Sequence, residues 1–231
     1  MKLYSKELKV GVVRFPGSNC DFDALNFFKR FGHHAEFVWY NDTCLPVVDL
    51  IVLPGGFAFG DRAYEKATGA YTIDPGALAI NAPIMSVLKR AASNSMPILG
   101  ICNGFQILVK AGLLPGKLVR NDSKKFFCDY VSCKVIGGSF FGDDAMRGKI
   151  FSVPVAHGYG KYVISKNERE RCERNGQVFL KYATVNPNGS VADIAGVSNE
   201  QKTIFGMMPH PERSPDGKYF MRAIVKRVSG V

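Results

Sequence analysis

The first half of the chain alternates short apolar runs with segments whose apolar residues recur at helical spacing. The apolar runs predict strands over residues 9–15, 35–40, 50–53 and 97–101. The helical spacing predicts helices over residues 21–31, 83–92 and 103–111. Because parallel strands need crossover connections, this alternation predicts an α/β fold with a mostly parallel central sheet flanked by helices.

The second half changes to shorter segments rich in β-forming residues. Further strands are predicted over residues 131–136, 162–164, 179–182, 192–197 and 203–207, and a last helix over 218–228. The stretch from residue 186 to residue 190, Asn-Pro-Asn-Gly-Ser, is dense in turn formers and predicts a tight loop. We expect extra β segments to be added here to the sheet of the first half.

The composition is that of one globular unit. The chain has 231 residues, of which 46% are hydrophobic and 22% are charged. No apolar run reaches the roughly 20 residues that span a bilayer, and residues 1–9 lack the apolar core of a signal peptide. We therefore expect one domain over residues 1–231, no membrane association and a cytoplasmic location.

Cysteine usage and charge argue against two further classes of protein: those built on a zinc site or a dense disulfide framework, and those that bind nucleic acid. The six cysteines form no CxxC pair, which argues against a zinc knuckle and a dense disulfide framework. The formal net charge is +10, but the lysines and arginines are spread along the chain with only short clusters such as residues 166–174. A solvated basic surface, or one that faces an acidic partner, explains this charge better than nucleic-acid binding.

The sequence Gly100-x-Cys102-x-Gly104 joins a predicted strand to a predicted helix. This is the spacing of a nucleophile elbow, with cysteine in the nucleophile position. The sharp turn strains the nucleophile, and the flanking glycines relieve clashes with neighbouring backbone. The helix that follows favours thiolate over thiol. The alternative is that Cys102 is a buried structural cysteine in a glycine-flanked turn. We interpret the other five cysteines as structural.

A thiolate that attacks an amide needs hydrogen-bond donors for the oxyanion. In an elbow, the amide after the nucleophile, here that of Asn103, has the correct direction. The second donor is expected from the loop after the strand 50–53, which contains Gly55, Gly56 and Phe57.

Four histidines are candidates for the base: His33, His34, His157 and His210. His33 and His34 lie in a polar stretch for which we predict a solvated connection. His157 precedes Gly158 and Gly160 and either lines the substrate cleft or is structural. His210 lies between two prolines, which predicts an extended segment in which Glu212 reaches one imidazole nitrogen while the other faces the nucleophile.

Together these residues resemble the class I glutamine amidotransferases, the triad-type glutaminases. The resemblance narrows to the glutaminase subunits of phosphoribosylformylglycinamidine synthases, which act in purine biosynthesis. It is carried by residues 14–21, 54–61, 100–108, 112–116, 188–190 with 194–196, and 207–213. Two features depart from the family pattern: Tyr159 replaces the usual acidic residue, and the segment 62–76 is longer than in bacterial members.

The resemblance implies a flavodoxin-like fold and a role for each matched residue. Cys102 is the nucleophile, His210 the base and Glu212 its orienter. The oxyanion and substrate-binding set is Gly55, Gly56, Phe57, Asn103, Gln106, His157 and Gly158. Gln106 is expected to bind the substrate, L-glutamine.

The resemblance also implies partners. Ammonia would pass to a large synthetase subunit that converts formylglycinamide ribonucleotide to formylglycinamidine ribonucleotide, with a small accessory subunit in the same assembly. The chain needs no metal or organic cofactor for its own step, and it contains no GxxxxGK[ST] motif. ATP and magnesium are therefore expected in the synthetase. The alternatives are another α/β cysteine hydrolase of the DJ-1-like or peptidase kind and a non-catalytic subunit.

Overall fold

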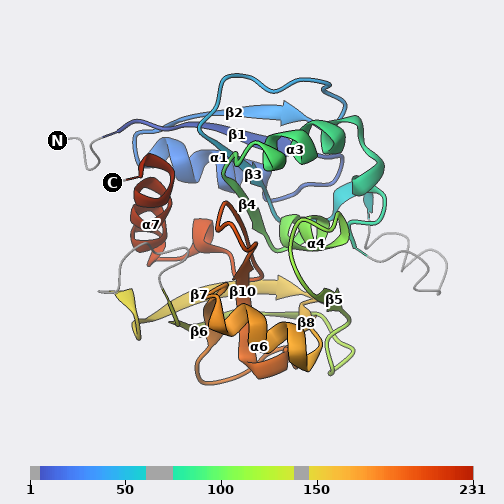
Figure 1. Ribbon diagram of the computed structural model, residues 1–231, viewed down its shortest axis with the longest axis vertical. Helices are drawn as coiled ribbons and strands as arrows, with labels where there is room; N and C mark the ends of the chain where they lie inside the picture. Colours follow the sequence, from blue (N-terminus) through green and yellow to red (C-terminus); the bar gives the residue numbers. More distant parts are fainter. Residues whose placement is uncertain (1–5, 61–74, 138–145, 231) are drawn as a thin grey trace.

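The computed structural model describes residues 6–60, 75–137 and 146–230. In this part of the chain, a nine-stranded sheet has the order β2-β1-β3-β4-β11-β10-β9-β6-β7, and β5 pairs with β8 in a separate two-stranded sheet (Figure 1). The strands are β1 (Lys9–Arg14), β2 (His34–Trp39), β3 (Leu50–Leu53), β4 (Ile98–Ile101), β5 (Lys117–Val119), β6 (Phe127–Val135), β7 (Ile150–His157), β8 (Lys161–Val163), β9 (Val178–Tyr182), β10 (Ile194–Ser198) and β11 (Ile204–Met207). The helices are α1 (Asp21–Arg30), α3 (Pro83–Ser93), α4 (Asn103–Lys110), α6 (Lys166–Arg174) and α7 (Gly217–Ser229).

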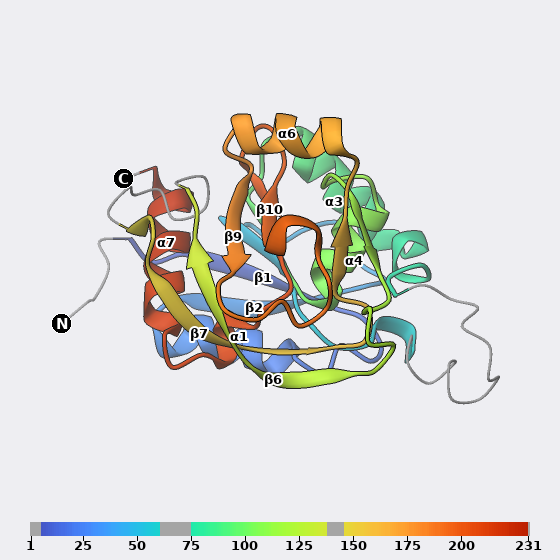
Figure 2. The ribbon, with the colours of Figure 1, turned by 90° about the horizontal axis from the view of Figure 1, so that it is seen from below.

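Five neighbouring strands, from β2 to β11, are parallel. Helices α1 and α7 lie on one face of this part of the sheet, and α3 and α4 lie on the other (Figures 1 and 2). The inner strands β3 and β4 are buried along their whole length, as continuous apolar runs require when both sheet faces are covered. The predicted α/β architecture is confirmed.

The rest of the sheet is antiparallel. Strands β10, β9, β6 and β7 extend it by antiparallel pairing, so the sheet as a whole is mixed. Strand β7 and helix α6 are not among the elements predicted from the sequence, where the residues of α6 stand out only as a cluster of charges. The strand predicted over residues 192–197 starts later, at Ile194, because Ala192 and Asp193 have positive φ angles of 51° and 59° in a short 3-10 turn.

The prediction that His33 lies in a solvated connection is wrong. His33 is 5% exposed, and its Nδ1 accepts a hydrogen bond of 3.2 Å from the backbone N–H of Leu8. His34, the next residue, is exposed at the start of β2. Most of the long segment 62–76 lies outside the described residues. No helix in the described ranges is long and apolar enough to cross a membrane.

The order of the parallel strands determines where the candidate site residues meet. Strands β3, β4 and β11 are adjacent and parallel, so their carboxyl ends lie at the same edge of the sheet. The glycine loop follows β3, Cys102 follows β4 and His210 follows β11. Three segments that are far apart in the sequence are thus brought together by strand pairing.

Candidate active site

Cys102 sits in a strained turn between β4 and α4. Its φ and ψ angles are 50° and −104°, it is 5% exposed, and its N–H donates to Met207 O at 2.8 Å. A Cβ atom on Gly104 would lie 2.0 Å from Leu53 O, and one on Gly100 would lie 2.7 Å from Gly104 O. The flanking glycines therefore let the start of α4 pack directly on the strands, as the elbow interpretation requires.

His210 and Glu212 form a buried pair. Nδ1 of His210 lies 2.6 Å from Oε1 of Glu212, and the two residues are 2% and 5% exposed. The backbone N–H of His210 donates to Pro154 O of β7 at 2.8 Å, which fixes His210 against β7. The predicted extended segment is wrong, because residues Pro211–Arg213 form a 3-10 turn. Proline is compatible with the first position of such a turn, and the turn brings Glu212 back onto the imidazole.

The electrostatics of this pair favour a charged imidazole. Burial alone lowers the pKa of His210, but the Glu212 carboxylate and then Cys102 raise it to about 10. Nε2 of His210 is buried and has no hydrogen-bond partner of ordinary geometry in the described part of the chain. It is therefore the nitrogen left to exchange a proton with the Cys102 side chain.

The loop after β3 packs against the side chains of both Cys102 and His210. A Cβ atom on Gly55 would lie 2.6 Å from Cε1 of His210 and 3.4 Å from Cβ of Cys102. Gly56 has a φ of 127°, a value that favours glycine, and its N–H has no hydrogen-bond partner among the residues described. The N–H of Phe57 donates to Gly17 O at 2.8 Å. Of the amides of Gly56 and Phe57 in this loop, the described part of the chain leaves that of Gly56 open for the expected second donor.

Asn103 and Gln106 connect three segments of the site. Oδ1 of Asn103 accepts from the N–H of Ala58 at 3.0 Å, and its Nδ2 donates to Oε1 of Gln106 at 2.9 Å. Nε2 of Gln106 donates to Tyr159 O at 2.8 Å. The sequence predicts that Gln106 binds substrate; the structure shows its two ends engaged in joining α4 to the segment after β7.

His157 is buried at the end of β7 and is 2% exposed. Burial, together with the nearby charge of His210, lowers the pKa of His157 to about 4, so its ring is neutral at physiological pH. The preceding residue, Ala156, places its carbonyl oxygen 3.7 Å from Sγ of Cys102. Gly158 follows, and the space beside it is open: a Cβ atom there would approach only Cδ2 of Phe126, at 3.8 Å, among the described residues.

Three buried residues beside this site were missed from the sequence. Cys20 is 6% exposed, and burial raises the pKa of its thiol to about 12. Asn121 and Asn188 are each 1% exposed and hydrogen-bond to the segment after β7. Asn188 lies among the residues that carry the family resemblance, but the turn-former composition of its loop gives no signal for a buried side chain.

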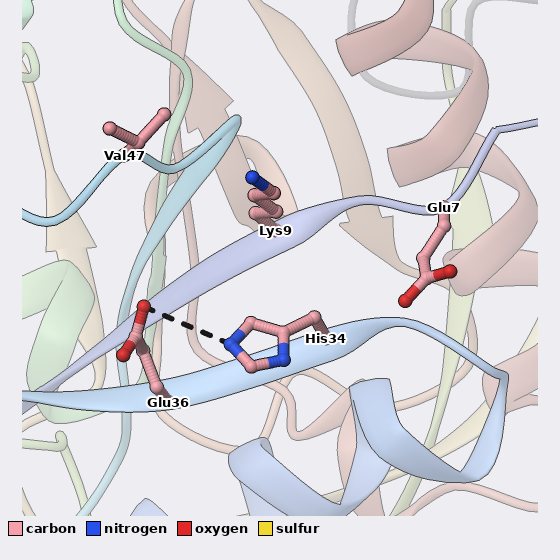
Figure 3. A pocket seen from close by; sticks show the side chains of 5 residues that line it. All are labelled: Glu7, Lys9, His34, Glu36 and Val47. Carbon is pink, nitrogen blue, oxygen red and sulfur yellow. Dashed lines mark ion pairs between the residues drawn. The ribbon is translucent and has the colours of Figure 1, made fainter.

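A surface hollow lies elsewhere, along the exposed side of β1 and β2 (Figure 3). Its lining residues are Glu7, Lys9, His34, Glu36 and Val47. Nε2 of His34 lies 3.9 Å from Oε1 of Glu36, and none of the five belongs to the predicted site. In the ranges that the structure describes, no group of three or more His, Cys, Asp or Glu residues is placed to hold a metal ion.

Comparisons with known proteins agree with this geometry. Residues 7–223 match the model of the CobB/CobQ-like glutamine amidotransferase domain. The chain is 47% identical over 219 residues to phosphoribosylformylglycinamidine synthase subunit PurQ of Thermomicrobium roseum, covering 90% of this chain and 89% of that one. A chain in the structure of PurLQS from Thermotoga maritima is 37% identical, with a TM-score of 0.82 and coverage of 96% and 99%. A glutamine amidotransferase of Thermotoga maritima shares the fold at 14% identity, with a TM-score of 0.61 and coverage of 98% and 100%.

Proposed function

The chain belongs to the CobB/CobQ-like glutamine amidotransferase domain family, and on this basis we propose how its site produces ammonia. It is the glutaminase subunit of a phosphoribosylformylglycinamidine synthase, which supplies ammonia for purine biosynthesis. The observation that carries the proposal is the buried pair of His210 and Glu212, 2.6 Å apart, beside the strained Cys102. We propose these three residues as nucleophile, base and orienter.

The first chemical step is attack by the Cys102 thiolate on the carboxamide carbon of glutamine. The raised pKa of His210 keeps its imidazole protonated beside the thiolate. As the C–S bond forms, the carbonyl oxygen becomes an oxyanion, and the N–H groups of Gly56 and Asn103 are the proposed donors to it. Their segments are held in place by the hydrogen bond between the Asn103 side chain and Ala58 N–H.

The second step breaks the C–N bond. The Nε2–H of His210 gives its proton to the departing nitrogen, so ammonia leaves and a glutamyl thioester remains on Cys102. The now neutral His210 then takes a proton from water, whose oxygen attacks the thioester, and glutamate leaves with the thiolate restored. Glu212 holds the ring throughout and stabilises its positive charge.

The remaining predicted residues have supporting roles in this proposal. Gln106 positions the segment after β7, since both ends of its side chain are engaged. Gly55 provides room for the catalytic pair, and His157 and Gly158 line the glutamine site. Phe57 shapes the site through its ring, because its N–H is bonded to Gly17 O.

The partners are a large synthetase subunit and a small accessory subunit, as in the PurLQS assembly. We propose that ATP and magnesium bind to the synthetase, since this sequence has no P-loop motif. We also propose that residues 1–231 form one domain, in keeping with the continuous sheet that joins both halves of the chain.

The test uses the chain assembled with its synthetase and accessory subunits. Wild type should release glutamate from glutamine and support synthesis from either glutamine or ammonia. Cys102→Ala should abolish the glutamine-dependent reaction and keep the ammonia-dependent one. Equal loss of both would mean that Cys102 is structural, and cleavage of small peptides without glutamine hydrolysis would favour a peptidase instead.

A further inference from the structure

The segment of residues 157–160, here called the His157 loop, connects β7 to β8 beside the nucleophile. It is joined to the elbow helix by the hydrogen bond from Gln106 to Tyr159 O. Two of its four residues are glycines, Gly158 and Gly160, which give it little stiffness of its own. Two buried asparagines from other parts of the chain hold it.

Asn121 lies just after β5 and bonds to both ends of the loop. Its Oδ1 accepts from the N–H of Gly160 at 2.9 Å, and its Nδ2 donates to His157 O at 2.9 Å. Its own backbone N–H donates to Gly158 O, also at 2.9 Å. Asn121 is only 1% exposed, so water does not compete for these bonds, and the loop backbone is fixed in one geometry.

Asn188 holds the loop from the opposite direction. Its Nδ2 donates to Gly160 O at 2.9 Å and to Oη of Tyr182 at 3.1 Å, and lies 3.5 Å from Nε2 of His157. Its Oδ1 accepts the backbone N–H of Ser190 at 3.0 Å. Because that N–H can only donate, the orientation of the Asn188 amide is settled, and Nδ2 faces the imidazole.

This orientation places the amide of Asn188 against the ring of His157. The two hydrogens of Nδ2 go to Gly160 O and Oη of Tyr182, and Nδ2 lies 3.5 Å from Nε2 of the ring. His157 is therefore held in one position, in a neutral form that adds no positive charge beside His210.

The turn uses only the Oδ1 end of the Asn188 side chain, which accepts from the N–H and the hydroxyl of Ser190. Asn186 already closes it, because its Oδ1 accepts the N–H groups of Gly189 at 2.9 Å and Ser190 at 3.1 Å and its Nδ2 donates to Ser190 O at 2.8 Å. The Nδ2 end of Asn188 is directed away from these bonds and into the buried space beside the His157 loop. A structural role in the turn therefore does not account for the hydrogen bonds that Nδ2 of Asn188 makes.

We propose that Asn121 and Asn188 are positioning residues for glutamine binding, which hold the His157 loop against the nucleophile elbow. This rests on the proposed glutaminase function. A loop that is fixed before substrate arrives binds glutamine without the entropic cost of ordering it. The hydrogen bonds of the two asparagines go to the loop and its neighbours and not to Cys102, His210 or Glu212, so the chemistry should persist when the loop is loosened.

The experiment measures glutamine KM and kcat for the assembled enzyme with Asn121→Ala, Asn188→Ala and the control Asn199→Ala. Asn199 makes a similar number of bonds, to residues 201–204, in the turn between β10 and β11. All three variants should lose thermal stability. Only Asn121→Ala and Asn188→Ala should raise KM, by roughly 3- to 10-fold, the size expected for the loss of one or two hydrogen bonds, with kcat within about twofold of wild type.

Two results would overturn the proposal. One is an unchanged KM in both loop variants; the other is a KM increase of the same size in Asn199→Ala. If the wild type releases no glutamate, the proposed function fails, and this is a separate outcome. Should an alanine variant not assemble, Asn188→Asp still decides, because it keeps the acceptor for the N–H of Ser190 and removes the donor to Gly160 O. A raised KM in this variant supports the proposal, and an unchanged KM contradicts it.

Discussion

The carboxylate of Glu212 lies 2.6 Å from Nδ1 of His210, and both groups are buried. A carboxylate in this position stabilises the charged imidazole and fixes the ring so that Nε2 remains for the thiol. The two residues belong to one short turn, so the proposed base and its proposed orienter form a unit. Removing the charge of Glu212 should therefore disable the base without disturbing the rest of the site.

Glu212→Gln should keep the shape of the turn and lower kcat for glutamine hydrolysis by roughly 10²–10⁴-fold. The reason is that the pKa of His210 falls when the carboxylate is removed, so the thiolate loses its charged partner. Ammonia-dependent synthesis by the assembled enzyme is the control and should not change. A variant with full glutaminase activity would contradict the assignment of Glu212.

The same pair predicts a stability change at high pH. The pKa of His210 is raised from 6.5 to about 10, so its contribution to the free energy of unfolding is complete below pH 6.5 and is lost as pH rises toward 10. Denaturant unfolding at pH 6.5 and pH 10 should show a smaller difference in Glu212→Gln than in wild type. If unfolding free energy changes equally between pH 6.5 and pH 10 in the two proteins, Glu212 does not stabilise the proton on His210.

His157 predicts the opposite dependence at low pH. Its pKa is lowered to about 4, so the unfolded chain binds a proton that the folded chain does not, and stability falls as pH drops from 6.5 toward 4. His33, whose pKa is lowered mainly by burial, contributes in the same direction. His157→Gln should reduce the slope of unfolding free energy against pH in this range. An unchanged slope would mean that His157 does not titrate as described.

Gly104→Ala should destabilise the fold by about 2–4 kcal/mol, because the added methyl group meets Leu53 O at 2.0 Å and forces α4 away from β3. Gly137→Ala is the matched control, since the nearest neighbour of its added Cβ among the described residues is Nη2 of Arg147 at 3.9 Å. Its unfolding free energy should lie within about 0.5 kcal/mol of wild type. Similar losses in both variants, measured by denaturant unfolding, would contradict the close-packing argument for Gly104.

The buried thiol of Cys20 should be much less reactive than that of Cys102. Burial raises the pKa of Cys20 to about 12, whereas Cys102 has the imidazole of His210 beside it. Mass spectrometry of peptides after brief treatment with iodoacetamide at pH 7 should show modification of Cys102 before Cys20. Exposed Cys44 and Cys128 serve as internal references. Labelling of Cys20 at the rate of Cys102 would contradict this order.

Most of the parallel sheet and the elbow could be predicted from the sequence because continuous apolar runs and paired glycines are local signals. Helix α6 was missed because nearly all its residues are polar or charged and only Cys172 is buried. A signal for it was nevertheless present: Ser165 accepts from the N–H of Glu168 at 3.3 Å, the start of a Ser-x-x-Glu capping pattern. Strand β7 was missed although its burial alternates; it contains Pro154, which argues against a strand.

The site residues likewise divide into those that have a local signal in the sequence and those that have none. Cys102, His210 and Glu212 could be proposed from the sequence because their spacing follows from local backbone geometry, and the structure places the three close together. Asn121 and Asn188 were not found, because His157 is separated from them by 36 and 31 residues along the chain. Contacts between loops that meet only in the folded chain leave no periodic trace in the sequence.

The meeting of β3, β4 and β11 at one edge has a consequence for how the chain tolerates changes in length. The loop after β3, Cys102 and His210 each follow their strand within a few residues, so an insertion there moves a reacting group directly. The connections that enter the same strands at the opposite edge, such as residues 41–49 before β3, carry none of the proposed catalytic groups. Engineered insertions should therefore be accommodated better at that opposite edge than within the few residues that directly follow β3, β4 or β11.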